Sequence, residues 1–191
     1  SFAESNGVKT GSLDDFDGDP DLLKAEIKTL GSVCKEYGIK ETITVNAKLL
    51  DDNVFAETYK HDITFNTKAL RNRVATEINL TAGNTMASRT VEDIVLHELG
   101  HVIAFEKGAN GIAIAKKIYY NINEKHVSSQ LIIEYLEDNI SQYCSVIYSN
   151  SWQKGYAEII PEVMVANKHK PTEFTKEFVK HIKGMEFNVE T

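Results

Sequence analysis

The sequence predicts an α+β fold in which a small mixed or antiparallel sheet is packed with helices and is followed by an all-helical C-terminal half. Short stretches that alternate apolar and polar residues lie in the first 80 of the 191 residues. After residue 90, apolar residues instead recur at intervals of three and four. An apolar content of 42% and a charged content of 26% are typical of a globular protein whose length allows one substantial core.

The N-terminal region predicts an arm and then a long helix. Residues 1–18 are rich in Gly, Ser and acidic side chains, so we expect a flexible N-terminal arm, and residues 19–191 are expected to form a single domain. Pro20 suits the first turn of a helix over residues 21–37, and Gly38 suits its C-terminal cap.

Strands are predicted next along the chain. Three β-prone stretches alternate well enough for a half-buried sheet: Glu41–Ala47, Val54–Tyr59 and His61–Phe65. A fourth strand is expected at Thr76–Leu80, after a short helix near Thr67–Arg73.

The rest of the chain predicts helices. Thr90 and Asp93 suit the N-terminal cap of a helix that ends before Gly108. Further helices are predicted at Gly111–Asn123, Ser128–Ser149, Tyr156–Asn167 and Thr172–Lys183.

Composition excludes some function classes. A net charge of −7 without a basic stripe argues against a nucleic-acid partner. No apolar run approaches the roughly 18 residues that cross a bilayer, so no membrane partner is expected. Cys34 and Cys144 are expected to be ordinary small apolar residues. The N-terminal sequence lacks Met and the pattern of a secretory signal, so we expect a soluble domain or processed product of a longer protein, and the localisation stays open.

The most informative segment is His97-Glu98-Leu99-Gly100-His101, an H-E-x-x-H pattern inside the helix predicted to begin near Thr90. Residues four apart share one face of a helix, so both imidazoles would be directed at one point, as a Zn²⁺ ion requires. Glu98 would lie beside them, where a carboxylate can act on metal-activated water without ligating the metal. Polar side chains in so apolar a helix are costly to bury unless a partner satisfies them.

A catalytic zinc usually has three protein ligands. Ala104 and Lys107 occupy positions where the compact H-E-x-x-H-x-x-G-x-x-H arrangement requires Gly and His, so the third ligand must lie downstream. The candidates are His126, Glu134, Glu137, Asp138, Glu158, Glu162 and His169. Glu158 and Glu162 stand four apart in an otherwise apolar helix, whereas the others lie in polar surroundings. We therefore expect Glu158 to be the ligand and Glu162 to orient a histidine.

The C-terminal half resembles the lethal-factor-like zinc metallopeptidases, gluzincins that include phage head-associated proteins. The matching segments are His97-Glu98-Leu99-Gly100-His101, Ile140-Ser141-Gln142-Tyr143 and Ala157-Glu158-Ile159-Ile160-Pro161-Glu162. The resemblance implies a zincin-like fold, Glu158 as zinc ligand and Tyr143 as a catalytic residue that assists the transition state. The gap between Tyr143 and Glu158 is longer than the family's, so Tyr148 and Tyr156 stay open as alternatives for that role. Pro161 departs from the family's pattern and is expected to kink the helix.

We therefore expect a zinc-dependent endopeptidase in which His97, His101 and Glu158 bind Zn²⁺ and Glu98 is the general base. Its partner would be a peptide or protein substrate, and Thr76–Leu80 is expected to be the edge strand that the substrate joins. The alternative is a zinc-stabilised structural module of a phage or prophage virion with little or no proteolytic activity. The resemblance implies a virion component as a structural partner.

Overall fold

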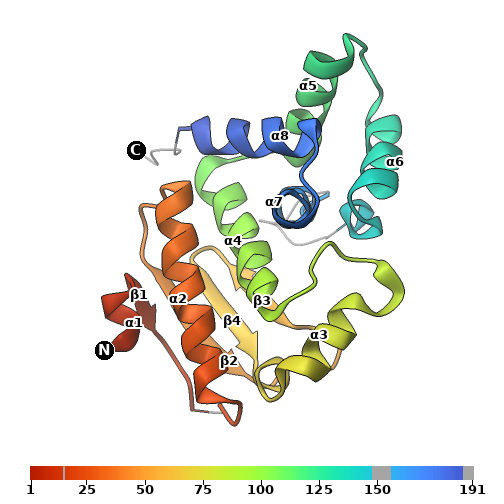
Figure 1. The fold of residues 1–191 in the computed structure, drawn as a ribbon. Coiled ribbons are helices and arrows are strands. Elements are labelled where there is room, and N and C mark those ends of the chain that lie inside the picture. Colours follow the sequence, from red (N-terminus) through yellow and green to blue (C-terminus); the bar gives the residue numbers. More distant parts are fainter. Residues whose placement is uncertain (15, 148–155, 187–191) are drawn as a thin grey trace. The chain divides into compact units, whose positions relative to one another are not determined.

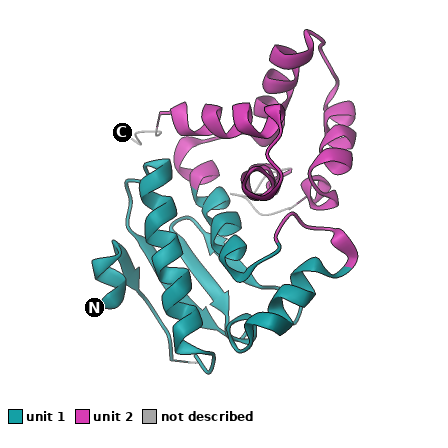
Figure 2. Ribbon diagram, viewed as in Figure 1, with its two compact units in different colours: residues 1–82, 89–102 teal, residues 83–88, 103–191 magenta. Residues whose placement is uncertain are grey.

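The computed structural model describes residues 1–14, 16–147 and 156–186, and it is α+β with a small mixed sheet (Figure 1). The chain divides into two compact units, drawn in two colours in Figure 2. The first unit comprises residues 1–82 and 89–102, and the second comprises residues 83–88 and the chain from residue 103. The expectation of a single domain over residues 19–191 stays a prediction.

The sheet belongs to the first unit and has the strand order β1-β2-β4-β3. Its strands are β1 (Val8–Thr10), β2 (Ile43–Lys48), β3 (Ala56–Tyr59) and β4 (Asp62–Asn66). β1 and β4 each pair with β2 in parallel, whereas β3 and β4 form an antiparallel hairpin. The three strands predicted between residues 41 and 65 are confirmed, and the sheet is mixed. β3 lies at one end of the strand order, so it is an edge strand.

Two helices bury one face of this sheet. α2 (Pro20–Tyr37) begins at the predicted proline and ends at Gly38, which has φ +66° and therefore caps the helix in the left-handed conformation. α4 (Val91–Lys107) carries the H-E-x-x-H segment, and its residues up to Val102 lie in the first unit. Leu30 of α2 and Leu99 of α4 belong to one core with the alternate strand residues Ile43, Val45, Ile63 and Phe65. The helix containing the candidate site is thus anchored on the sheet.

The N-terminal segment, which the sequence predicts to be a flexible arm over residues 1–18, contains a helix and a strand. Residues Phe2–Ser5 form a short helix, α1, with a capping box between Ser1 and Glu4. β1 follows and extends the sheet, and both Ala3 and Val8 are buried in the core. The pairing of β1 with β2 joins segments more than 30 residues apart, so nothing in the local sequence pattern reveals it.

The segment Thr76–Leu80 is helical, so its prediction as a strand was wrong. It lies in α3 (Arg73–Thr81), which follows the 3₁₀ turn η1 (Thr67–Leu70) and precedes a second one, η2 (Ala82–Asn84). Asn72 caps α3 by accepting a hydrogen bond from the Ala75 N–H at 3.0 Å. Thr76 and Leu80, four residues apart, are buried, while Ile78 between them is 62% exposed. The burial therefore follows the helical period.

The described part of the second unit is mainly helical, as the sequence predicts. The single helix predicted over Ser128–Ser149 is too long, however, because the observed helix ends at Asn139 and a separate 3₁₀ turn follows it. After the end of α4 come α5 (Gly111–Asn123), α6 (Ser129–Asn139), η3 (Gln142–Ser145), α7 (Ile159–His169) and α8 (Glu173–Gly184). α5 packs against α6 and α8, and α7 packs against α8 and η3. The rings of Tyr135 and Phe174 join α6 to α8 with centroids 5.2 Å apart. Among all described residues, no helix has the length and apolarity needed to span a bilayer.

Candidate metal centre

Helix α4 begins where its cap was predicted, and its first turn explains why. The Asp93 carboxylate accepts hydrogen bonds from the backbone N–H groups of Arg89 at 2.7 Å and Thr90 at 2.9 Å. Asp93 and Glu92 also place negative charge at the positive end of the helix dipole, and Lys107 places positive charge at the other end. Because the helix begins at this cap, the directions in which the side chains of its next two turns point are fixed.

Those turns carry the H-E-x-x-H side chains. His97 and His101 lie one turn apart, and their ring centroids are 5.2 Å apart with an interplanar angle of 72°. The two histidines and Glu98 are nearly buried, with exposed fractions of 5%, 6% and 6%. Adjacent imidazoles on one helical face can bind one cation, as the sequence predicts.

Glu98 has a specific partner on the edge strand. The Thr58 hydroxyl of β3 donates a hydrogen bond to Glu98 Oε2 with an oxygen–oxygen distance of 2.6 Å. The same hydroxyl oxygen is 3.4 Å from the Glu98 carbonyl oxygen. Thr58 is 5% exposed, so this hydrogen bond is protected from water. The sequence did not reveal this partner, because it depends on the position of β3 in the sheet.

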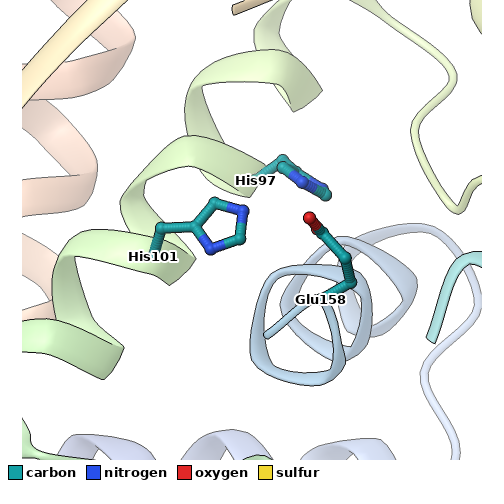
Figure 3. A group of neighbouring side chains, drawn as sticks. All are labelled: His97, His101 and Glu158. Carbon is teal, nitrogen blue, oxygen red and sulfur yellow. The ribbon is translucent and has the colours of Figure 1, made fainter. Parts of the chain in front are cut away.

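His97, His101 and Glu158 form a group that can hold a metal ion (Figure 3). Each offers one ligand atom, and these atoms all lie within 4.8 Å of one another. All three side chains are buried, and Glu158 is 2% exposed. Two imidazole nitrogens and a carboxylate oxygen are a donor set that suits Zn²⁺ and other divalent transition metals. The residues present thus fit a cation, although the donor set does not identify the metal.

Glu158 occupies the N-terminal cap of α7, where the dipole of the helix favours a negative charge. Pro161 lies in the first turn, whose N–H groups have no acceptor within the helix, so it does not produce the kink expected from the sequence. The start of α5 packs tightly beside this turn. A Cβ atom added to Gly111 would lie only 2.8 Å from the Cβ of Ile159, the residue after Glu158.

Glu162, one turn further along α7, is fully buried and connects three segments of the second unit. Its Oε2 accepts hydrogen bonds from the Ser141 hydroxyl at 2.5 Å and from the Ala87 N–H at 2.6 Å. The Tyr143 N–H donates to the Thr85 carbonyl at 3.0 Å, which ties the same two segments together again. The expectation that Glu162 orients a histidine stays a prediction.

The tyrosine alternatives are placed as follows. Tyr143 is half-buried in η3, and Tyr156 is half-buried two residues before Glu158. Tyr148 lies outside the described residues. The catalytic role assigned to Tyr143 by resemblance stays a prediction. Close by, burial raises the pKa of the Cys144 thiol well above its usual range, so this cysteine is a packed apolar residue as expected.

The remaining ligand candidates are not grouped with the histidines. His126 is exposed and stacks on Tyr120 with ring centroids 4.2 Å apart, and His169 and Glu134 are also exposed. Glu137 and Asp138 do not join a donor group either. Within residues 1–14, 16–147 and 156–186, the His97, His101 and Glu158 group is the one cluster of three or more such side chains close enough to hold a metal ion.

Comparison of the chain with protein-family models, with curated proteins and with solved structures returns no match. The fold and the donor group are therefore the observations on which a function can be argued.

Proposed function

We propose that the protein is a zinc-dependent endopeptidase with a zincin-like fold, of the lethal-factor-like type that the sequence resembles. The observation that supports it best is the buried donor group of His97, His101 and Glu158, with a carboxylate, Glu98, next to the first ligand on the same helix. A purely structural site needs no such carboxylate, whereas hydrolysis needs a base within reach of the attacking water.

A divalent cation bound by this group would acidify water and polarise the carbonyl of the scissile peptide. Glu98 accepts a proton from the attacking water as the new C–O bond forms. It then delivers that proton to the amine nitrogen as the C–N bond breaks. Tyr143 is proposed to donate a hydrogen bond to the oxyanion that develops on the former carbonyl oxygen.

An extended peptide is the substrate that suits this fold, and β3 replaces Thr76–Leu80 as the strand proposed to receive it. β3 lies at the end of the sheet, and its residue Thr58 contacts Glu98 directly. An added peptide strand would form its hydrogen bonds along the outer edge of β3, the last strand in the order. A peptide paired with β3 in this way would have its scissile bond close to Glu98, the proposed general base.

The test measures metal content and cleavage of a peptide library in the same preparations. Glu98→Gln should retain one equivalent of metal and lose cleavage by at least about a hundredfold, because general-base catalysis contributes about that factor or more. Glu158→Ala should lose the metal, whereas Glu162→Ala, four residues further along the same helix, should keep it if it folds. Cleavage by Glu98→Gln at the parental rate would refute the proposed base.

The alternative of a zinc-stabilised virion module predicts a different result. The purified protein would then bind metal and unfold on its removal, but it would cleave no peptide even at high concentration. In that case a phage or prophage structural protein would replace the substrate as the proposed partner.

A further inference from the structure

The Thr58–Glu98 hydrogen bond is the strongest observation that the proposed mechanism does not use. Both side chains lie within the first unit, on β3 and α4. Of the described residues, Thr58 alone hydrogen-bonds the Glu98 carboxylate, and it does so through Oε2. The orientation of this carboxylate therefore depends on one hydroxyl group.

That hydroxyl is itself held firmly. A threonine side chain is stiff about χ1 because it is branched at Cβ. Thr58 pairs with Ile63 in the β3–β4 hairpin, and Ile63 is fully buried in the core. The sheet, and not the helix that carries Glu98, thus sets the position of the hydroxyl oxygen.

The geometry also decides which oxygen of Glu98 is engaged. A hydroxyl group donates one proton, and the distance of 2.6 Å to Oε2 is far more favourable than the 3.4 Å to the backbone carbonyl. The other oxygen, Oε1, has no hydrogen-bond partner among the described residues, and the exposed fraction of residue Glu98 is 6%. Oε1 is therefore the oxygen left for a water molecule.

We propose that Thr58 is a positioning residue that holds Oε2 of Glu98, so that Oε1 accepts the proton of the attacking water. The inference rests on the proposed function, because it concerns the general base of that reaction. The proton moves from water to Oε1 and from there to the leaving nitrogen, while the Thr58 proton stays on its hydroxyl.

The experiment compares Thr58→Val with Thr58→Ser. Valine keeps the branched shape and removes the hydroxyl, so kcat for peptide cleavage should fall at least about tenfold through loss of base orientation. KM and metal content should stay within about twofold of the parent, because the substituted group ligates nothing. Serine restores the hydroxyl and should return kcat to within about threefold of the parent. A lost hydroxyl is thereby distinguished from a disturbed strand.

Thr64→Val is the matched control. Thr64 lies on the neighbouring strand β4, and its side chain makes no hydrogen bond with the described residues. The same chemical change there should leave kcat unchanged. A Thr58→Val enzyme that keeps parental kcat, or a Thr58→Ser enzyme as slow as Thr58→Val, would overturn the inference.

A crystal structure of Thr58→Val separates failure of this inference from failure of the proposed function. If the parent protein cleaves no peptide, the proposed function fails. The role of Thr58 is then tested only by the position of the Glu98 carboxylate in this crystal structure. Positioning by Thr58 requires Glu98 Oε2 to leave its place in that variant. A carboxylate that superposes on the parent would show that Thr58 does not hold it.

Discussion

Replacing Ser141 by alanine should destabilise the protein by about 2 kcal/mol, because this serine donates a hydrogen bond to the fully buried carboxylate of Glu162. Its hydroxyl is 2.5 Å from Glu162 Oε2, and the exposed fractions of the two residues are 6% and 0%. A hydrogen bond to a charged group contributes about 1.5–3 kcal/mol. For a chain of this length, 1 kcal/mol corresponds to roughly 2–4 °C in Tm, so a decrease of about 4–8 °C is expected.

The assay is urea and thermal unfolding of the parent and of Ser141→Ala under identical metal loading. Ser145→Ala is the control, because the Ser145 hydroxyl donates only locally, to the Gln142 carbonyl at 3.0 Å on an exposed turn. That variant should lose no more than about 0.5 kcal/mol. A double-mutant cycle between Ser141→Ala and Glu162→Gln should give a coupling of about 1 kcal/mol or more. Equal losses for Ser141→Ala and Ser145→Ala would refute the reasoning.

Three further outcomes are expected. Removing metal with a chelator should lower Tm. Adding zinc at a hundredfold excess over its Kd should raise the free energy of unfolding by about 2.7 kcal/mol. A His101→Ala variant should show no such response to zinc in the same thermal scans. Gly111→Ala should cost about 1–2 kcal/mol in urea unfolding, because its new Cβ overlaps Ile159; an unchanged midpoint would show that the two helices separate freely. Burial, assisted by the charge of Lys117, lowers the pKa of His181 from 6.5. The unfolded state then binds more protons, so this residue should reduce stability as the pH falls below about 6.5. His181→Gln should weaken that decline in pH-dependent unfolding, and a parallel decline in both proteins would count against it.

Some of the predicted helices and strands depend only on nearby residues in the sequence, and these were the ones predicted correctly. α2, α4 and α5 carry apolar residues at helical spacing and recognisable caps, so the sequence alone was sufficient for them. The segment Thr76–Leu80 is too short to distinguish a strand from a helix by its apolar pattern. Residues Thr76 and Leu80 lie on one face under either the strand period of two residues or the helical spacing of four. Its Asn72 cap decided in favour of a helix.

The residues of the candidate site also differ in whether nearby sequence is enough to identify them. His97, Glu98 and His101 are one helical turn, so their arrangement follows from spacing. Glu158 was inferred from a carboxylate in an apolar segment, an argument from the cost of burial. By contrast, Thr58 carries no signal, because an isolated threonine in a strand is common. Its role depends on which strand ends the sheet and on the register of the hairpin, which are properties of the whole first unit.

The hairpin also has a consequence for the order of folding. β3 and β4 are joined by the two residues Lys60 and His61, and Lys60 adopts φ 55°, so this turn can form in microseconds without help from the rest of the chain. β1 must instead wait for a partner more than 30 residues away, and its loop closes slowly. We therefore expect a nascent chain to build its sheet from the hairpin outward, with the N-terminal strand docking last.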